Sequence, residues 1–230
     1  MKRSFTDQIG HTITIESPKR IVSLVPSQTE LLAYFSLDKE VVGITKFCVH
    51  PGKWFRNKTR VGGTKNVDFN KIETLNPDLI ICNKEENTES DVKALLGKYP
   101  VWTSDIHNLG DALNMIKSIG AITYRTEDAQ KLTLQIKKNF KEIIPDKIAP
   151  TRVLYLIWRE PYMAAGKDTF IDTMLSECNF FHFFGSIACS IQCSNKGPHG
   201  SSGNIIYWYV IFFQCFNYTN VSNSTGTAPA

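Results

Sequence analysis

Between residues 21 and 122, short apolar runs alternate with segments that have the spacing of amphipathic helices. Parallel strands need long crossover connections, so this alternation predicts a parallel sheet covered by helices. The predicted strands are Ile21–Val25, Val41–Ile44, Leu79–Cys82 and Val101–Trp102. The first predicted helix begins near Ser27, and further helices are predicted at residues 51–57, 71–75, 89–98 and 109–119.

Two local signals add detail at the start of the chain. Residues 5–15 alternate polar and apolar side chains around Gly10, which predicts a β-hairpin or an edge strand. Pro26 is expected to end the first buried strand. Ser27 and Glu30 have the spacing of a capping box, so we expect Ser27 to be the N-cap of the first helix.

A second group of elements follows residue 122. Residues 126–143 place their apolar side chains on one helical face, a strand pattern restarts at 153–157, and residues 170–178 again have helical spacing. The predicted fold class is α/β, with two lobes of parallel sheet covered by helices, one long backbone helix between them, and an incomplete C-terminal lobe. We expect a ligand-binding lobe at 1–122, the connecting helix at 123–147, the start of the second lobe at 148–180 and a tail at 181–230.

The chemistry of the chain changes abruptly near residue 179. Residues 179–230 contain one charged residue, Lys196, yet they hold half of the phenylalanines and half of the cysteines. We interpret this stretch as translated from a shifted reading frame, with a divergent natural tail as the alternative. Its most apolar segment, Ile205–Phe216, is shorter than the roughly 20 residues of a membrane-spanning helix.

Composition and motifs argue against several functions. The net charge of +4 gives no strong basic footprint for nucleic acid. The sequence has no nucleophile elbow, Walker loop or Gly-rich dinucleotide motif. Cys48 and His50 could serve as nucleophile and base, but catalysis also needs a third, orienting group, so we predict no enzyme. Cys189, Cys193 and the histidines at 182 and 199 lack standard zinc spacing, so no metal site is predicted.

Binding is the better-supported reading. Loops at the carboxyl ends of parallel strands form the usual ligand crevice of such folds. The loops predicted there mix aromatic, soft and polar side chains, which suits a large, flat, partly apolar ligand. Packing in the core is the alternative role for each aromatic residue. The candidate ligand-binding residues are Pro26, Ser27, Gln28, Phe47, Cys48, His50, Trp54, Lys84, Glu85, Glu86, Trp158, Arg159, Tyr162 and Met163.

An ordered set of motifs resembles one protein family. The set comprises Asp7-x-x-Gly10-His11-Thr12, Pro18–Leu24, Pro26–Leu31, Val42–Thr45, Val61–Thr64, Leu75–Ile80 and Arg152–Asp168. Over about residues 5–180 the chain resembles the substrate-binding proteins of ABC transporters for iron siderophores, haem and cobalamin, and within them the cobalamin-binding branch. The resemblance implies two α/β lobes joined by a helix at Thr126–Ile143. It also places Phe47 where the cobalamin binder sets an aromatic ring against the corrin.

The resemblance further implies a monomeric protein outside the cytoplasm that passes a metal chelate to an ABC-transporter permease and has no cofactor of its own. Siderophore or haem binding and a cytoplasmic corrinoid carrier are the alternatives. Two departures bear on them. No apolar signal-peptide run follows Met1-Lys2-Arg3, and Asn70 stands where the family has an acidic docking residue on its first lobe.

Overall fold

The computed structural model describes residues 2–143, 151–160, 162–182 and 190–191. The chain divides into two compact units. The first unit comprises residues 1–106 and 110–133, and the second comprises residues 107–109 and 134–230. The boundary at residue 133 falls inside the long helix α6 (Thr126–Ile143), whose bounds match the sequence prediction. Most of the predicted tail at 181–230, with Cys189, Cys193 and the histidine at 199, lies outside the described residues.

A five-stranded parallel sheet forms the centre of the first unit, which confirms the predicted α/β fold. Its strand order is β5-β4-β3-β6-β7, so the chain adds strands outward from β3 in both directions. The topological switch point, where open α/β sheets bind ligands, therefore lies between β3 and β6. The strands are β3 (Ile21–Ser23), β4 (Val41–Ile44), β5 (Thr59–Arg60), β6 (Leu79–Asn83) and β7 (Val101–Ser104).

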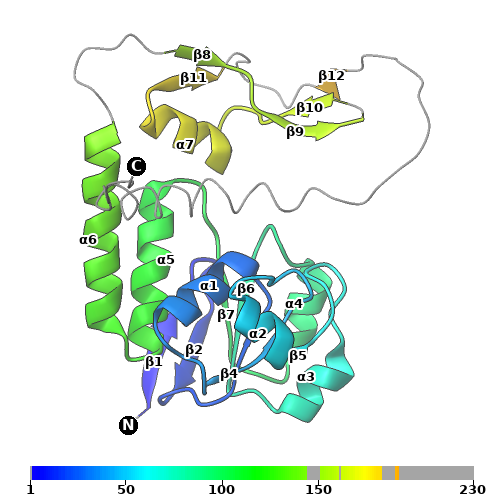
Figure 1. The fold of residues 1–230 in the computed structure, drawn as a ribbon. Coiled ribbons are helices and arrows are strands. Elements are labelled where there is room, and N and C mark those ends of the chain that lie inside the picture. Colours follow the sequence, from blue (N-terminus) through cyan, green and yellow to red (C-terminus); the bar gives the residue numbers. More distant parts are fainter. Residues whose placement is uncertain (1, 144–150, 161, 183–189, 192–230) are drawn as a thin grey trace, which may run out of the picture. The chain divides into compact units, whose positions relative to one another are not determined.

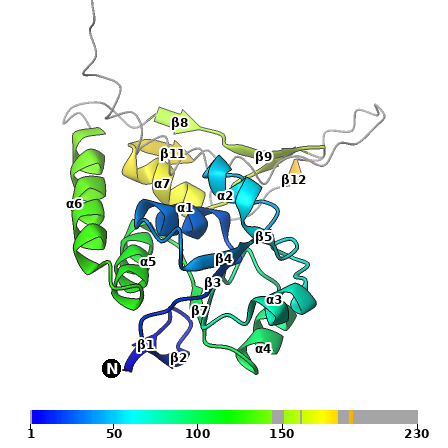
Figure 2. The same ribbon diagram turned by 60° about the horizontal axis from the view of Figure 1, so that its bottom comes forward.

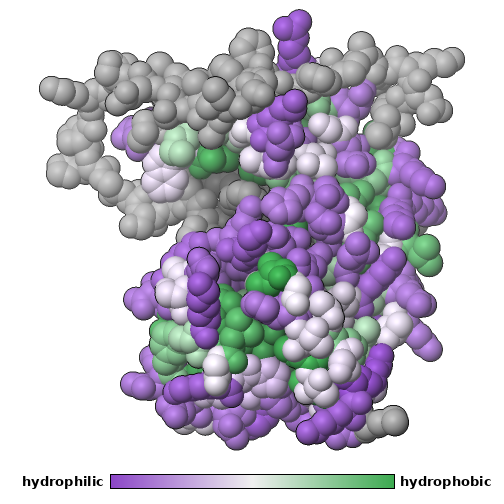
Figure 3. Space-filling model, turned by 180° about the vertical axis from the view of Figure 1, so that it is seen from behind, coloured by the Kyte–Doolittle hydropathy of each residue, from purple (hydrophilic) through white to green (hydrophobic). Residues whose placement is uncertain are grey.

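Helices surround this sheet (Figure 1). Every residue of β3, β6 and β7 is buried, as expected for strands covered on both faces. Asp68 and Thr88 cap α3 and α4 through their side chains. On the face drawn in Figure 3, hydrophilic side chains surround a hydrophobic area in the lower half of the picture. The helices are α1 (Pro26–Tyr34), α2 (Gly52–Asn57), α3 (Phe69–Leu75), α4 (Glu89–Leu96) and α5 (Leu109–Ile122).

The first helix begins differently from its prediction. Its N-cap is Val25, which makes no capping side-chain hydrogen bond, so the capping box expected at Ser27 and Glu30 is wrong. Pro26 already lies in the first turn of α1 and does not separate the strand from the helix. Proline suits this position because its fixed φ matches the helix and the missing N–H has no intrahelical partner there.

The predicted N-terminal hairpin is confirmed, and it covers an edge of the sheet. Strands β1 (Arg3–Thr6) and β2 (Thr12–Ile15) pair antiparallel, and they lie beside β7 (Figure 2). The Gln8 N–H donates to the Thr103 carbonyl at 3.1 Å, and the Thr103 N–H donates to Asp7 Oδ2 at 3.2 Å. The hairpin turn thus satisfies outward-facing backbone groups that an edge strand would otherwise expose.

The second unit corrects two predictions. The strand expected at 153–157 is two strands, β8 (Thr151–Val153) and β9 (Leu156–Arg159). The segment expected as a loop after it forms an antiparallel hairpin of β9 with β10 (Tyr162–Ala164). Leu156, Trp158 and Arg159 are exposed and Ile157 is half-buried, so β9 lacks the burial on both faces that a covered parallel strand has. The remaining elements are α7 (Phe170–Glu177), β11 (Phe180–His182), parallel to β8, and β12 (Ser190–Ile191).

Two features are absent from the described residues. No helix in the described part of the chain has the length and apolar character that crossing a bilayer requires. Within those same ranges, no three histidine, cysteine or acidic side chains come together as a potential metal site.

Candidate ligand-binding site

The carboxyl edge of the sheet brings together the loops that carry the predicted site residues of the first unit. Ser27, Phe47 and Glu86 are half-buried there, and His50, Lys84 and Glu85 are exposed. Pro26, Gln28, Cys48 and Trp54 are buried. The ten candidates therefore separate into an outer group that can meet a ligand and an inner group that supports it.

The buried position of Cys48 favours its structural role. Its Sγ lies 3.1 Å from Thr29 Oγ1, which donates to it, and 3.2 Å from Thr45 Oγ1. Burial raises the pKa of this thiol, which opposes formation of the nucleophilic thiolate. Cys48 thus fastens the loop after β4 to the first turns of α1, and the packing alternative fits it better than catalysis or contact with a ligand.

Trp54 is also an interior residue. Its side chain is 2% exposed, and its indole Nε1 donates to Asp38 Oδ1 at 2.9 Å. The same hydrogen bond is the main cause that lowers the pKa of Asp38. The Lys58 ammonium lies 5.4 Å from the ring centroid. These contacts fix α2 in the lobe, so the structure favours the packing alternative for Trp54.

Phe47 is the aromatic side chain presented at this edge. It is half-buried, its ring lies against Gly63, and a Cβ atom on that glycine would be 3.3 Å from Phe47 Cε2. The Lys46 ammonium lies 5.1 Å from the ring centroid. The ring is therefore supported by the neighbouring loop and remains partly open to solvent.

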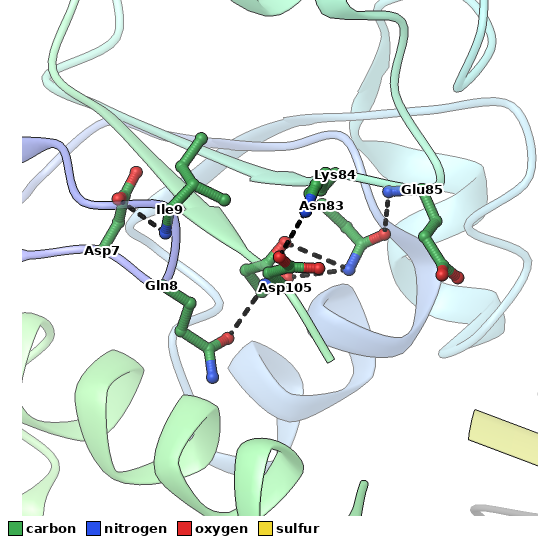
Figure 4. A network of polar contacts seen from close by, with 8 residues as sticks. Asp7, Gln8, Ile9, Asn83, Lys84, Glu85 and Asp105 are labelled. Carbon is green, nitrogen blue, oxygen red and sulfur yellow. Dashed lines mark hydrogen bonds and ion pairs between the residues drawn. The ribbon is translucent and has the colours of Figure 1, made fainter. Parts of the chain in front are cut away.

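A buried polar layer lies beneath the loops, and of its residues only Gln28 was predicted from the sequence. Gln28 Nε2 donates to Ser104 Oγ, and Asn83 Nδ2 donates to the same oxygen at 3.0 Å. Asn83 Oδ1 accepts the backbone N–H of Glu85 at 2.9 Å (Figure 4), and it also accepts the N–H of Glu86 at 3.0 Å. These bonds hold the loop after β6 in one conformation. Polar residues ending an otherwise apolar strand, as Asn83 ends β6, were the available signal.

Two lysines of this edge make polar contacts with neighbouring loops. Lys84 Nζ lies 2.6 Å from Asp105 Oδ2, and Lys65 Nζ donates to the Glu85 carbonyl. The Asp105 N–H donates to Gln8 Oε1 at 3.1 Å, so the hairpin turn reaches this network (Figure 4). Lys84 consequently helps to order the rim through its ion pair with Asp105.

The candidates of the second unit lie on the β9–β10 hairpin. Trp158 is 44% exposed, its Nε1 donates to the Glu160 carbonyl at 3.0 Å, and Met163 is 39% exposed. Arg159 Nε lies 4.0 Å from Glu160 Oε1. Tyr162 belongs to β10. These residues share one hairpin, where the sequence predicted one loop.

Glu30 on α1 makes the stability of the fold depend on pH. Burial raises its pKa from 4.5 to about 7, so the folded state disfavours the ionised form. Its contribution is therefore present below about pH 4.5 and is lost as the pH rises through about 7. We expect Glu30→Gln to flatten the fall in unfolding free energy across that window, measured by urea denaturation at several pH values. Burial also raises the pKa of Glu86, so part of the slope should remain. An unchanged slope would contradict this assignment.

Comparison with known proteins defines the family. The family model described as "Periplasmic binding protein" matches residues 21–196, which is more than half of the chain. The chain belongs to this family. An uncharacterised ABC transporter substrate-binding lipoprotein of Bacillus subtilis is 28% identical over 74% of this chain and 57% of its own length. A vitamin B12-binding protein of Pectobacterium atrosepticum is 21% identical over 73% of this chain and 62% of its own. The chain thus spans about three fifths of these relatives.

Solved structures show the same fold. The periplasmic vitamin B12-binding protein of Vibrio cholerae has a TM-score of 0.67 at 20% identity, over 76% of this chain and 69% of that one. A siderophore-binding protein has a TM-score of 0.71 at 16% identity, over 81% of this chain and 70% of that one. A periplasmic haem-binding protein from Roseiflexus has a TM-score of 0.60 at 20% identity, over 71% of this chain and 65% of that one. These likenesses confirm the fold, and their ligands differ.

Proposed function

We propose that this periplasmic binding protein captures cobalamin or a similar corrinoid at the carboxyl edge of its first lobe and passes it to an ABC importer. The half-buried ring of Phe47, supported by the loops beside the switch point, carries the proposal. An aromatic face of this kind suits a flat, partly apolar macrocycle. The relatives named as an ABC transporter lipoprotein and as a vitamin B12-binding protein support this reading and a location outside the cytoplasm.

The function is binding without chemical change. The Cys48 thiol is buried, and its raised pKa opposes a nucleophilic role. His50 is exposed, and no hydrogen bond joins its side chain to Cys48. Both observations argue against the enzymatic alternative.

Equilibrium dialysis of the full chain tests the proposal. Cyanocobalamin, haemin and the ferric trihydroxamate ferrioxamine B are each dialysed against the folded protein. We expect retention of cyanocobalamin at about one molecule per chain, with an unchanged absorption spectrum after release. Retention of haemin or ferrioxamine B alone would replace the corrinoid assignment with another chelate. Retention of none, or a chemically altered ligand, would contradict the proposal.

Phe47→Ala should weaken this binding without unfolding the lobe. Loss of the aromatic face removes about 1–2 kcal/mol of stacking and apolar contact, which raises the Kd by about tenfold. Phe69→Ala is the matched control, because Phe69 is a 40% exposed aromatic residue on α3. Its Kd should equal that of the wild type. Equal effects of the two substitutions would contradict the role of Phe47.

A further inference from the structure

One buried side chain connects several loops of the candidate site. Asn87, which is 3% exposed, follows β6. Its Oδ1 accepts the backbone N–H of Asn83 at 2.9 Å. Its Nδ2 donates to the Thr64 carbonyl at 2.9 Å and, with a longer bond of 3.5 Å, to the Leu24 carbonyl. A single amide therefore joins the loops that follow β3, β5 and β6.

Each of these loops carries part of the site. Leu24 precedes the turn into Pro26 and Ser27 at the start of α1. Thr64 follows Gly63, against which the Phe47 ring lies. Asn83 holds the backbone of Glu85 and Glu86. Asn87 does not belong to the outer group, yet it fixes the spacing between residues that do.

The chemistry of this position calls for an amide. One partner of the side chain is an N–H donor and the other two are carbonyl acceptors, so the side chain must accept and donate at once. An alanine would leave these buried groups unpaired, and an aspartate would lose both donors while keeping nearly the same shape.

We propose that Asn87 is a positioning residue of the ligand site, which sets the three loops in their binding arrangement before the chelate arrives. This inference rests on the proposed function. A site whose loops are already fixed avoids the loss of conformational freedom that ordering them on binding would require. Asn87 then affects affinity through the loops and makes no contact with the ligand.

The test combines affinity with local exchange. Asn87→Ala and the nearly isosteric Asn87→Asp are compared with Thr123→Ala, which removes a buried hydroxyl at the end of α5, bonded to the Ile119 carbonyl at 2.7 Å. Dialysis against cyanocobalamin gives the Kd. Hydrogen exchange of the ligand-free protein gives the protection of residues 62–66 and 83–87. If Asn87→Ala fails to fold, Asn87→Asp gives the answer.

Both Asn87 variants should raise the Kd by at least about tenfold and speed exchange in those two segments. Thr123→Ala should change neither, although it removes a buried polar group. Asn87→Asp with wild-type affinity and wild-type exchange would overturn the role of Asn87 alone. A wild-type chain that retains no chelate would overturn the proposed function and, with it, the ligand role of Asn87.

Discussion

Asp7→Ala is expected to lower the unfolding free energy by about 3 kcal/mol, because it leaves three backbone N–H groups without their acceptor. The Asp7 side chain is fully buried. Its Oδ1 accepts the N–H of Ile9 at 3.1 Å and of His11 at 2.7 Å, and its Oδ2 accepts the N–H of Thr103 on β7. Urea denaturation, followed by the fluorescence of the buried Trp54 and Trp102, measures the loss.

A second substitution separates these hydrogen bonds from the nearby charge. The His11 Nδ1 lies 3.8 Å from Asp7 Oδ2, and the His11 side chain is 48% exposed. Asp7 is buried, but the contact is long and its His11 side is open to solvent, so it should contribute only about 0–1 kcal/mol and His11→Ala should have a small effect. A loss of similar size in both variants would show that the contact with His11, and not the backbone capping, is what Asp7 supplies.

Gly120→Ala should lower the unfolding free energy by about 2–3 kcal/mol through overpacking, although alanine has a higher helix propensity than glycine. A Cβ atom on Gly120 would lie 2.3 Å from Ala129 Cβ and 3.0 Å from the Arg125 carbonyl oxygen. Neither atom belongs to a flexible side chain. The start of α6 would therefore have to move away from α5, which the same denaturation experiment detects.

Gly97→Ala is the matched control for this substitution. Gly97 ends α4 with φ of −69°, and the nearest atom to an added Cβ is 3.7 Å away. Alanine there should be neutral or stabilise by about 0.5 kcal/mol. Replacing Ala129 with glycine in the Gly120→Ala background should recover part of the loss. A Gly120→Ala variant as stable as Gly97→Ala would contradict the close approach of the two helices.

The fold of the first unit could be predicted because its strands are buried on both faces. A continuous apolar run such as Leu79–Cys82 is typical of a strand in a sheet that helices cover on both faces. The helix at Thr126–Ile143 has a clear apolar face. β5, with only two exposed residues, has no such pattern and was missed. In the second unit, β9 is largely exposed, and its sequence does not indicate that it pairs antiparallel with β10.

The site could be predicted only at the level of its loops. The predicted parallel topology is enough to place Ser27, Phe47 and Lys84 at the same edge of the sheet. It does not say which of the neighbouring side chains point inward. Cys48 and Trp54 proved to be interior. The supporting roles of Asn83, Asn87 and Ser104 depend on tertiary hydrogen bonds that join segments far apart in the sequence. No local sequence pattern predicts such bonds.

Hydrogen exchange of the full chain, with and without saturating cyanocobalamin, tests the central claim most directly. Bound ligand should slow exchange in residues 26–28, 45–50 and 83–87, which form the carboxyl edge of the first unit. Residues 69–75 on α3 and 89–96 on α4 should exchange at unchanged rates. Protection of those helices with an unaffected carboxyl edge, or no protection anywhere, would contradict the account.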